Sequence, residues 1–159
     1  MAAGVADRIR VFAADAVSPA RLPDGAGRLV AVGWATVEIE RAVRHLATEL
    51  NVDAAIFVEG AGSAAVGGRC VVADGILAGD LSLAVLEPST EGRTAAGLAR
   101  WDEGPLVAWY AITASDARSL DSGRPWLPGP FGPERLVGGD PLTGPHRLLV
   151  VVGTGTIPA

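Results

Sequence analysis

The sequence contains no lysine: all 13 of its basic residues are arginine. This absence excludes lysine Schiff-base chemistry, attachment of pyridoxal phosphate and the phosphate-loop lysine. There are only two histidines, His45 and His146, and one cysteine, Cys70. A three-histidine or multi-cysteine zinc site is therefore excluded, and so is a disulfide scaffold. No run approaches the ~18 apolar residues of a membrane span, and no signal-peptide pattern is present.

Positive charge is also scarce. The chain of 159 residues has a formal net charge of −5, with 49% apolar and 19% charged residues. A basic stripe for binding phosphates is missing, which argues against a nucleic-acid partner. The apolar content is too high for a disordered chain. We therefore expect one folded, cytoplasmic domain without a membrane partner, and the abundance of Ala, Gly and Arg is typical of a GC-rich bacterial genome.

An amphipathic helix is predicted over residues 37–50. Its apolar residues recur at spacings of three and four, which would bury Ile39, Val43 and Leu46 against a core. Apolar runs that predict strands precede and follow this helix, at 28–35, 54–60, 68–75 and 81–87. The first half of the chain therefore has the order β-α-β-β-β.

A second, similar round follows from Pro88. Helices are predicted at 88–101 and 114–121, and strands at 106–112, 134–139 and 146–152. Residues 122–145 are rich in Pro and Gly, which predicts either an irregular, ordered lid outside the sheet or a mobile surface loop, with the stretch at 134–139 as the strand candidate within it. Two rounds of the same order indicate an internal duplication.

Common cofactor and nucleophile motifs are weak or missing. GAGSAA at 60–65 follows a predicted strand like a relaxed dinucleotide fingerprint, but Gly67 and Gly68 would break the helix that this fingerprint requires. A hairpin loop is the simpler interpretation. No GxSxG motif occurs, and the two histidines give a Ser-His-Asp triad no local support.

Residues 81–112 carry a family resemblance. LAVLEP at 83–88 is followed by the predicted helix TAAGLARW at 94–101 and by Glu103-Gly104 before the next strand. This arrangement resembles methylmalonyl-CoA epimerase and the vicinal-oxygen-chelate superfamily, which includes the glyoxalase and bleomycin-resistance proteins. The resemblance implies an α+β fold in which two βαβββ modules form a cup-shaped mixed sheet. It also implies a homodimer.

The domain organisation follows from this resemblance. Residues 1–27 would form an N-terminal extension. Residues 28–159 would form the vicinal-oxygen-chelate-like domain, with modules at about 28–87 and 88–159.

The metal ligands of the family are replaced. Its four ligand positions fall on Ala31, Ala84, Val107 and either Val150 or Val151. Aliphatic side chains supply no nitrogen, oxygen or sulfur donor. We therefore expect no metal and no other cofactor.

The predicted contents of the cup follow from strand alternation, because residues two apart point to the same face. The ligand would be small and apolar or flat and aromatic, with Trp109 as a wall and Trp126 in the lid. Glu59 and Glu87 are candidate catalytic carboxylates. The predicted ligand-binding residues are Ala31, Gly33, Ala84, Leu86, Val107, Trp109 and Trp126.

Three functions remain open. The first is a metal-independent small-molecule binding protein of the glyoxalase/bleomycin-resistance type. The second is a metal-independent isomerase, cyclase or lyase that uses a carboxylate for proton transfer. The third is a degenerate structural or dimerisation module with a cup that is packed shut. The first two predict an open pocket, whereas the third predicts a filled one.

Overall fold

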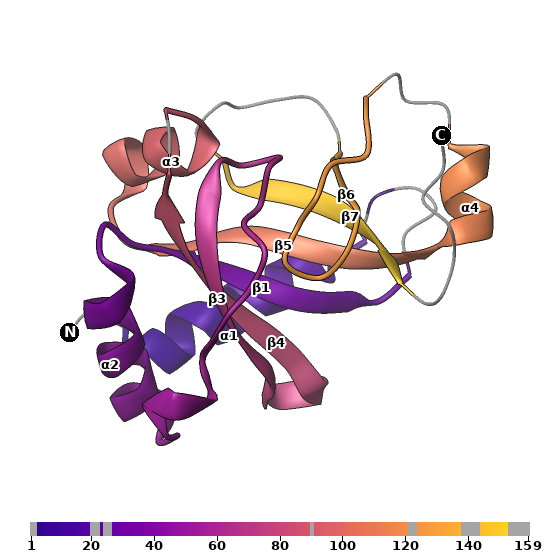
Figure 1. The fold of residues 1–159 in the computed structure, drawn as a ribbon. Coiled ribbons are helices and arrows are strands. Elements are labelled where there is room, and N and C mark those ends of the chain that lie inside the picture. The colour runs from indigo at the N-terminus through magenta and orange to yellow at the C-terminus, as the bar shows by residue number, and fades with distance from the viewer. Residues whose placement is uncertain are drawn as a thin grey trace.

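The structure is a computed structural model that describes residues 3–19, 23, 27–89, 91–120, 124–137 and 144–152. Four helices and seven strands are present in these residues (Figure 1). The helices are α1 (Val5–Ala16), α2 (Ile39–Leu50), α3 (Arg93–Trp101) and α4 (Ala114–Ser119). The strands are β1 (Leu29–Ala35), β2 (Val58–Glu59), β3 (Gly68–Leu77), β4 (Leu81–Pro88), β5 (Gly104–Thr113), β6 (Glu134–Leu136) and β7 (His146–Val152).

All seven strands form one mixed sheet in the order β2-β3-β4-β1-β5-β7-β6. The first module, β1-α2-β2-β3-β4, occupies one half, and β5-α4-β6-β7 occupies the other. Within each module the first and last strands are parallel neighbours, whereas the modules meet at the antiparallel pair β1–β5. This topology confirms the predicted α+β fold and its mixed sheet.

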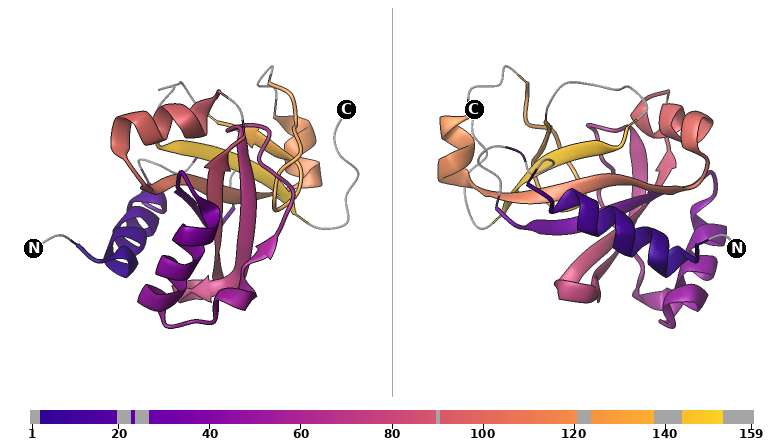
Figure 2. Two further views of the ribbon diagram at one scale, coloured as in Figure 1. Left: turned by 60° about the vertical axis from the view of Figure 1, so that its left-hand side comes forward. Right: turned by 180° about the vertical axis from the view of Figure 1, so that it is seen from behind.

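One face of the sheet, here called the outer face, is covered by α1, α2 and α4. Figure 2 shows α1 and α2 side by side against the strands. In α2, Ile39 and Leu46 are buried as predicted, Val43 is partly buried and packs against the same core, and His45 is exposed. None of the described helices is long and apolar enough to cross a membrane.

Helix α1 lies within the N-terminal extension and was not predicted. It buries Val5 and Ile9 in the outer-face core, and the Tyr110 hydroxyl donates a hydrogen bond to the Ala16 carbonyl at 2.7 Å. Helix α1 is therefore packed onto the sheet of the domain.

The segment at 54–60 differs from the prediction of a strand. Residues Ala54–Ile56 form a 3₁₀ turn, and only Val58–Glu59 pair with β3. The Asp53 carboxylate accepts a hydrogen bond from the Ala55 amide at 2.9 Å. Such side-chain caps favour a turn over an extended chain.

The predicted lid is only partly irregular. Residues Glu134–Leu136 pair with β7 and form the edge strand β6, so this part belongs to the sheet. Residues 124–133, which contain four prolines, stay outside the ladder except for a bridge between Leu127 and Glu134. Proline lacks the N–H that a ladder requires. Residues 121–123 and 138–143 lie outside the described part.

Candidate functional site

The second face of the sheet, here called the cup face, carries most of the predicted site. Ala31, Ala84, Leu86, Val107 and Trp109 belong to one buried cluster on this face. The cluster is completed by Ala35, Val66, Cys70, Leu106, Leu148 and Val150. The positions implied by the resemblance, Ala31, Ala84 and Val107, and the residues that alternation added to them, Leu86 and Trp109, therefore lie together.

Trp109 fills the centre of the cup. Its side chain is fully buried, and its ring meets Phe131 edge-on, with 5.1 Å between the ring centres. Gly33 gives the indole its space, since a Cβ atom there would lie 2.8 Å from Trp109 Cζ3 and 2.9 Å from Leu86 Cδ1. A ligand that stacked on Trp109 would first have to displace Phe131.

Trp126 lies elsewhere. It packs against the outer-face core, and the Arg135 guanidinium lies over its ring at 4.3 Å. Within the segment that was predicted to be a lid, Phe131 reaches the cup and Trp126 does not.

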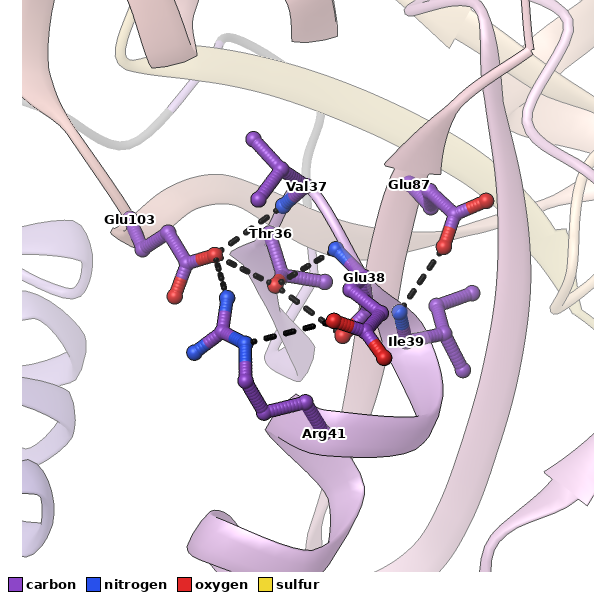
Figure 3. Close-up of polar contacts among 7 residues, drawn as sticks. All are labelled: Thr36, Val37, Glu38, Ile39, Arg41, Glu87 and Glu103. Carbon is purple, nitrogen blue, oxygen red and sulfur yellow. Dashed lines mark hydrogen bonds and ion pairs between the residues drawn. The ribbon is translucent and has the colours of Figure 1, made fainter.

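The predicted catalytic residue Glu87 caps a helix in the structure. Its Oε2 atom accepts a hydrogen bond from the Ile39 amide at 2.8 Å, at the first turn of α2 (Figure 3). Carboxylates are favourable at this end because the helix dipole is positive there. This contact gives Glu87 a structural role on the outer side of the sheet.

Glu103 holds the other side of the same turn. One of its oxygens accepts hydrogen bonds from the Thr36 hydroxyl at 2.8 Å and the Val37 amide at 3.1 Å, and it pairs with Arg41 (Figure 3). Burial acts to raise the pKa of Glu103, but these donors outweigh it and the pKa is lowered. Two carboxylates from different strand ends thus fix the start of α2.

Glu59, the other predicted catalytic residue, lies on the edge strand β2. Its carboxylate pairs with Arg69 at 2.9 Å, and Arg69 also contacts Glu40 on α2 at 3.3 Å. Glu59 is therefore exposed and held toward the outer face, away from Trp109.

The carboxylate inside the cup belongs to Glu134, which the sequence analysis did not single out. Glu134 is fully buried at the start of β6. Its Oε2 atom accepts a hydrogen bond from Trp109 Nε1 at 2.8 Å. Its Oε1 atom accepts one from the Ser63 hydroxyl and one from the Ala65 amide at 3.3 Å.

Burial raises the pKa of Glu134 above its ordinary value, although the hydrogen bonds from Ser63, Trp109 and the Ala65 amide act in the opposite direction. Burial also raises the pKa of the nearby Cys70 thiol to about 12, so this cysteine stays protonated. Carboxyl groups whose pKa is shifted by burial are common at functional sites, where the surroundings tune how readily the group takes up or releases a proton.

The contact between Ser63 and Glu134 joins the two ends of the sheet. Ser63 lies in the loop between β2 and β3, whereas Glu134 lies on the opposite edge strand. The Ala64 amide also donates to the Pro128 carbonyl at 3.0 Å. These contacts close the cup over Trp109.

A groove of about 430 Å³ lies beside this closure. Glu59 and Asp74 are its acidic lining residues. The rest of its lining is formed by Ile56, Val58, Gly60, Val72, Ile76 and Pro130.

The metal-ligand positions implied by the resemblance do not fit a metal. Ala31, Ala84 and Val107 are fully buried on the cup face. Val150 takes the fourth position, because Val151 packs into the outer-face core. In the part of the chain that the structure describes, no group of three His, Cys, Asp or Glu side chains is arranged to hold a metal ion.

Comparison with solved structures identifies the architecture. Methylmalonyl-CoA epimerase from Mycobacterium tuberculosis superposes with a TM-score of 0.61 at 14% identity, over 82% of this chain and 91% of that one. A Streptomyces coelicolor methylmalonyl-CoA epimerase variant in complex with 2-nitronate-propionyl-CoA gives 0.60 at 16% identity, over 81% and 99%. The chain has the vicinal-oxygen-chelate fold.

Another solved structure of this fold, a methylmalonyl-CoA epimerase in complex with methylmalonyl-CoA and NH4+, superposes with a TM-score of 0.57 at 18% identity, over 84% and 99% of the two chains. No protein-family model and no curated protein matches the sequence. The resemblance read from residues 81–112 is thus confirmed at the level of the vicinal-oxygen-chelate fold.

Proposed function

We propose that this protein is a metal-independent isomerase that moves a proton at a carbon atom next to a carbonyl group, with Glu134 as the acid and base. The observation that carries the proposal is the complete burial of Glu134 inside the cup, held by Ser63 and Trp109. Burying a carboxylate costs free energy even when it is hydrogen-bonded. A residue with only a packing role would therefore be better served by an apolar side chain.

The chemistry of the step is simple. The ionised Glu134 carboxylate removes the α-proton, and the electron pair of the C–H bond moves to the carbonyl oxygen as an enolate. The carboxylic acid so formed returns a proton to the carbon atom, and the configuration is inverted when the planar enolate has turned its other face to Glu134 before the proton returns. A base is most effective when its pKa lies near the working pH, and burial shifts the pKa of Glu134 in that direction.

The solved structures support the reaction class. Two of the methylmalonyl-CoA epimerases with this fold are complexes with acyl-CoA compounds. The aliphatic residues at the metal-ligand positions support a reaction that depends on the protein carboxylate alone.

The direct test is exchange of the α-proton with solvent. The protein is incubated in D2O with dimethyl methylmalonate or methylmalonyl-CoA, and loss of the α-proton signal is followed by NMR. Exchange above the buffer rate is expected with at least one compound and should disappear in Glu134→Gln. Glu49→Gln, an exposed change on α2, is the matched control.

The variants Glu59→Gln and Glu87→Gln test the two carboxylates that the sequence indicated. Glu87→Gln should keep the exchange activity if the protein remains folded, because this carboxylate caps α2 outside the cup. Glu59 lines the groove beside the cup, so Glu59→Gln should change the affinity for the probe and keep the proton-transfer step. Loss of activity in Glu87→Gln at full stability, together with activity in Glu134→Gln, would refute the role of Glu134.

A structural or dimerisation module is the second candidate, and the burial of Trp109 against Phe131 favours it. In that case Glu134→Gln changes stability, and no probe exchanges or binds. Sedimentation analysis tests the homodimer that the resemblance implies.

A further inference from the structure

The groove beside the closed cup has a volume of about 430 Å³, which is enough for a small molecule. Gly60 forms part of its wall, and a Cβ atom there would lie 3.6 Å from Val72 Cγ2 and 4.0 Å from Pro130 Cβ. These are ordinary contact distances, so the groove has room for further atoms at this point. Its lining is mainly apolar.

The groove adjoins Glu134. Pro130 is a groove residue, and the preceding residue, Gly129, packs directly on the carboxylate: a Cβ atom on Gly129 would lie 2.1 Å from Glu134 Oε2. Residues 129–130 therefore separate the groove from the buried acid. A substrate in the groove would reach Glu134 only after this segment had moved aside.

The charge around the groove is negative. Arg69, which pairs with the groove residue Glu59, is shared with Glu40. Asp74 accepts a hydrogen bond from the Ser82 hydroxyl, which brings no positive charge. Among the described residues that line the groove, none is basic.

We infer that this groove is the substrate site and that it takes an uncharged carbonyl compound with small alkyl groups, not an acyl-CoA ester. The inference rests on the proposed proton-transfer function. Apolar walls favour alkyl groups. The surplus of carboxylates repels phosphates and carboxylates, and this repulsion is strongest at low salt.

Three compounds that share the methylmalonyl group test the inference. Dimethyl methylmalonate is uncharged, monomethyl methylmalonate is a monoanion of similar size, and methylmalonyl-CoA adds the charges and bulk of coenzyme A. Binding is measured by calorimetry at low and high salt. The uncharged diester should bind roughly tenfold more tightly than the monoanion at low salt, and the difference should shrink as salt is added. Equal or tighter binding of the monoanion or of methylmalonyl-CoA would overturn the inference.

Two pairs of variants locate the site. Asp74→Asn should reduce the preference for the diester about threefold, whereas Asp7→Asn, on the distant helix α1, should leave it unchanged. Gly60→Leu should fill the groove and abolish diester binding. Gly4→Leu is its control, since a Cβ atom there would meet no atom within 4 Å.

The outcomes separate this inference from the proposed function. If the diester binds at Gly60 but its α-proton never exchanges above the buffer rate, the groove assignment holds and the proton-transfer function fails. If methylmalonyl-CoA exchanges in a manner that depends on Glu134, the function holds and the substrate class is wrong. If none of the three compounds binds, the groove assignment is wrong.

Discussion

Replacing Trp109 by Phe tests the packing of the cup most sharply. The change keeps an aromatic ring beside Phe131 but removes the indole N–H, which donates to Glu134 Oε2 at 2.8 Å. Ser63 and the Ala65 amide still donate to the other carboxylate oxygen. The variant therefore isolates one buried hydrogen bond and one small cavity.

The expected cost has two parts. A cavity on the order of 40 Å³ costs about 1 kcal/mol at ~24 cal/mol per Å³. The lost hydrogen bond costs roughly 0.5–1.5 kcal/mol when Glu134 is protonated and about 1.5–3 kcal/mol when it is ionised. The free energy of unfolding should therefore fall by about 2 kcal/mol below pH 4.5, where Glu134 is protonated, and by about 2.5–4 kcal/mol at a pH above the raised pKa of Glu134.

Urea denaturation followed by circular dichroism at both pH values measures these changes. Trp101→Phe is the control, because Trp101 is 52% exposed and its replacement should change stability by less than about 0.5 kcal/mol. A cost for Trp109→Phe below about 0.5 kcal/mol would show that the indole does not fill the cup. A cost independent of pH would show that the indole does not bond to Glu134.

The other predictions concern Glu134, Gly33, Glu103 and metal content. The native pKa of Glu134 is raised, so the native state holds this proton more tightly than the unfolded chain. The stability gained in this way is complete below pH 4.5, the ordinary pKa, and is lost as the pH rises through the native pKa. Denaturation of Glu134→Gln should not show this loss. Gly33→Ala should cost about 1–3 kcal/mol in the same assay, because its methyl group meets Trp109 and Leu86. The pKa of Glu103 is lowered, so ionised Glu103 stabilises the native state at any pH above its pKa in the unfolded chain, and this stabilisation is lost as the pH falls. Glu103→Gln should therefore reduce Tm at pH 7 more than at pH 3. Elemental analysis should find no stoichiometric Zn, Co, Ni, Mn or Fe, and a chelator should leave Tm unchanged.

The sheet and its two faces could be predicted because alternation is a local property. The resemblance implied that Ala31, Ala84 and Val107 point into the cup, alternation added Trp109 to them, and the structure buries all four in one cluster. Tyr110, the next residue along β5, lies on the opposite face, where its hydroxyl bonds to α1. The resemblance and alternation together thus sufficed for the floor of the cup.

Glu134 could not be predicted in this way. It follows a run of proline and glycine with no periodic pattern, and its partner Ser63 is 71 residues away in the sequence. A carboxylate next to an arginine in a polar segment is typical of a solvated surface. Only the pairing of β6 with β7 places Glu134 against Trp109.

The roles of Glu59 and Glu87 failed to follow from sequence for a related reason. Alternation along a strand does not identify the partners of a side chain. Glu87 caps α2 and Glu59 pairs with Arg69, and both contacts join segments that are distant in sequence or lie on different strands. Helix caps supplied by another strand leave no local signature.

The antiparallel pair β1–β5 has a consequence for any attempt to divide the chain. Both strands are buried on both faces. Their backbones pair along the whole of β1, from Leu29 opposite Tyr110 to Ala35 opposite Gly104. A fragment that ended between the two modules would expose one long, apolar strand with a row of unpaired backbone groups, which is a template for self-association. Either half expressed alone should therefore aggregate, and the two halves expressed together should recover a soluble, paired complex.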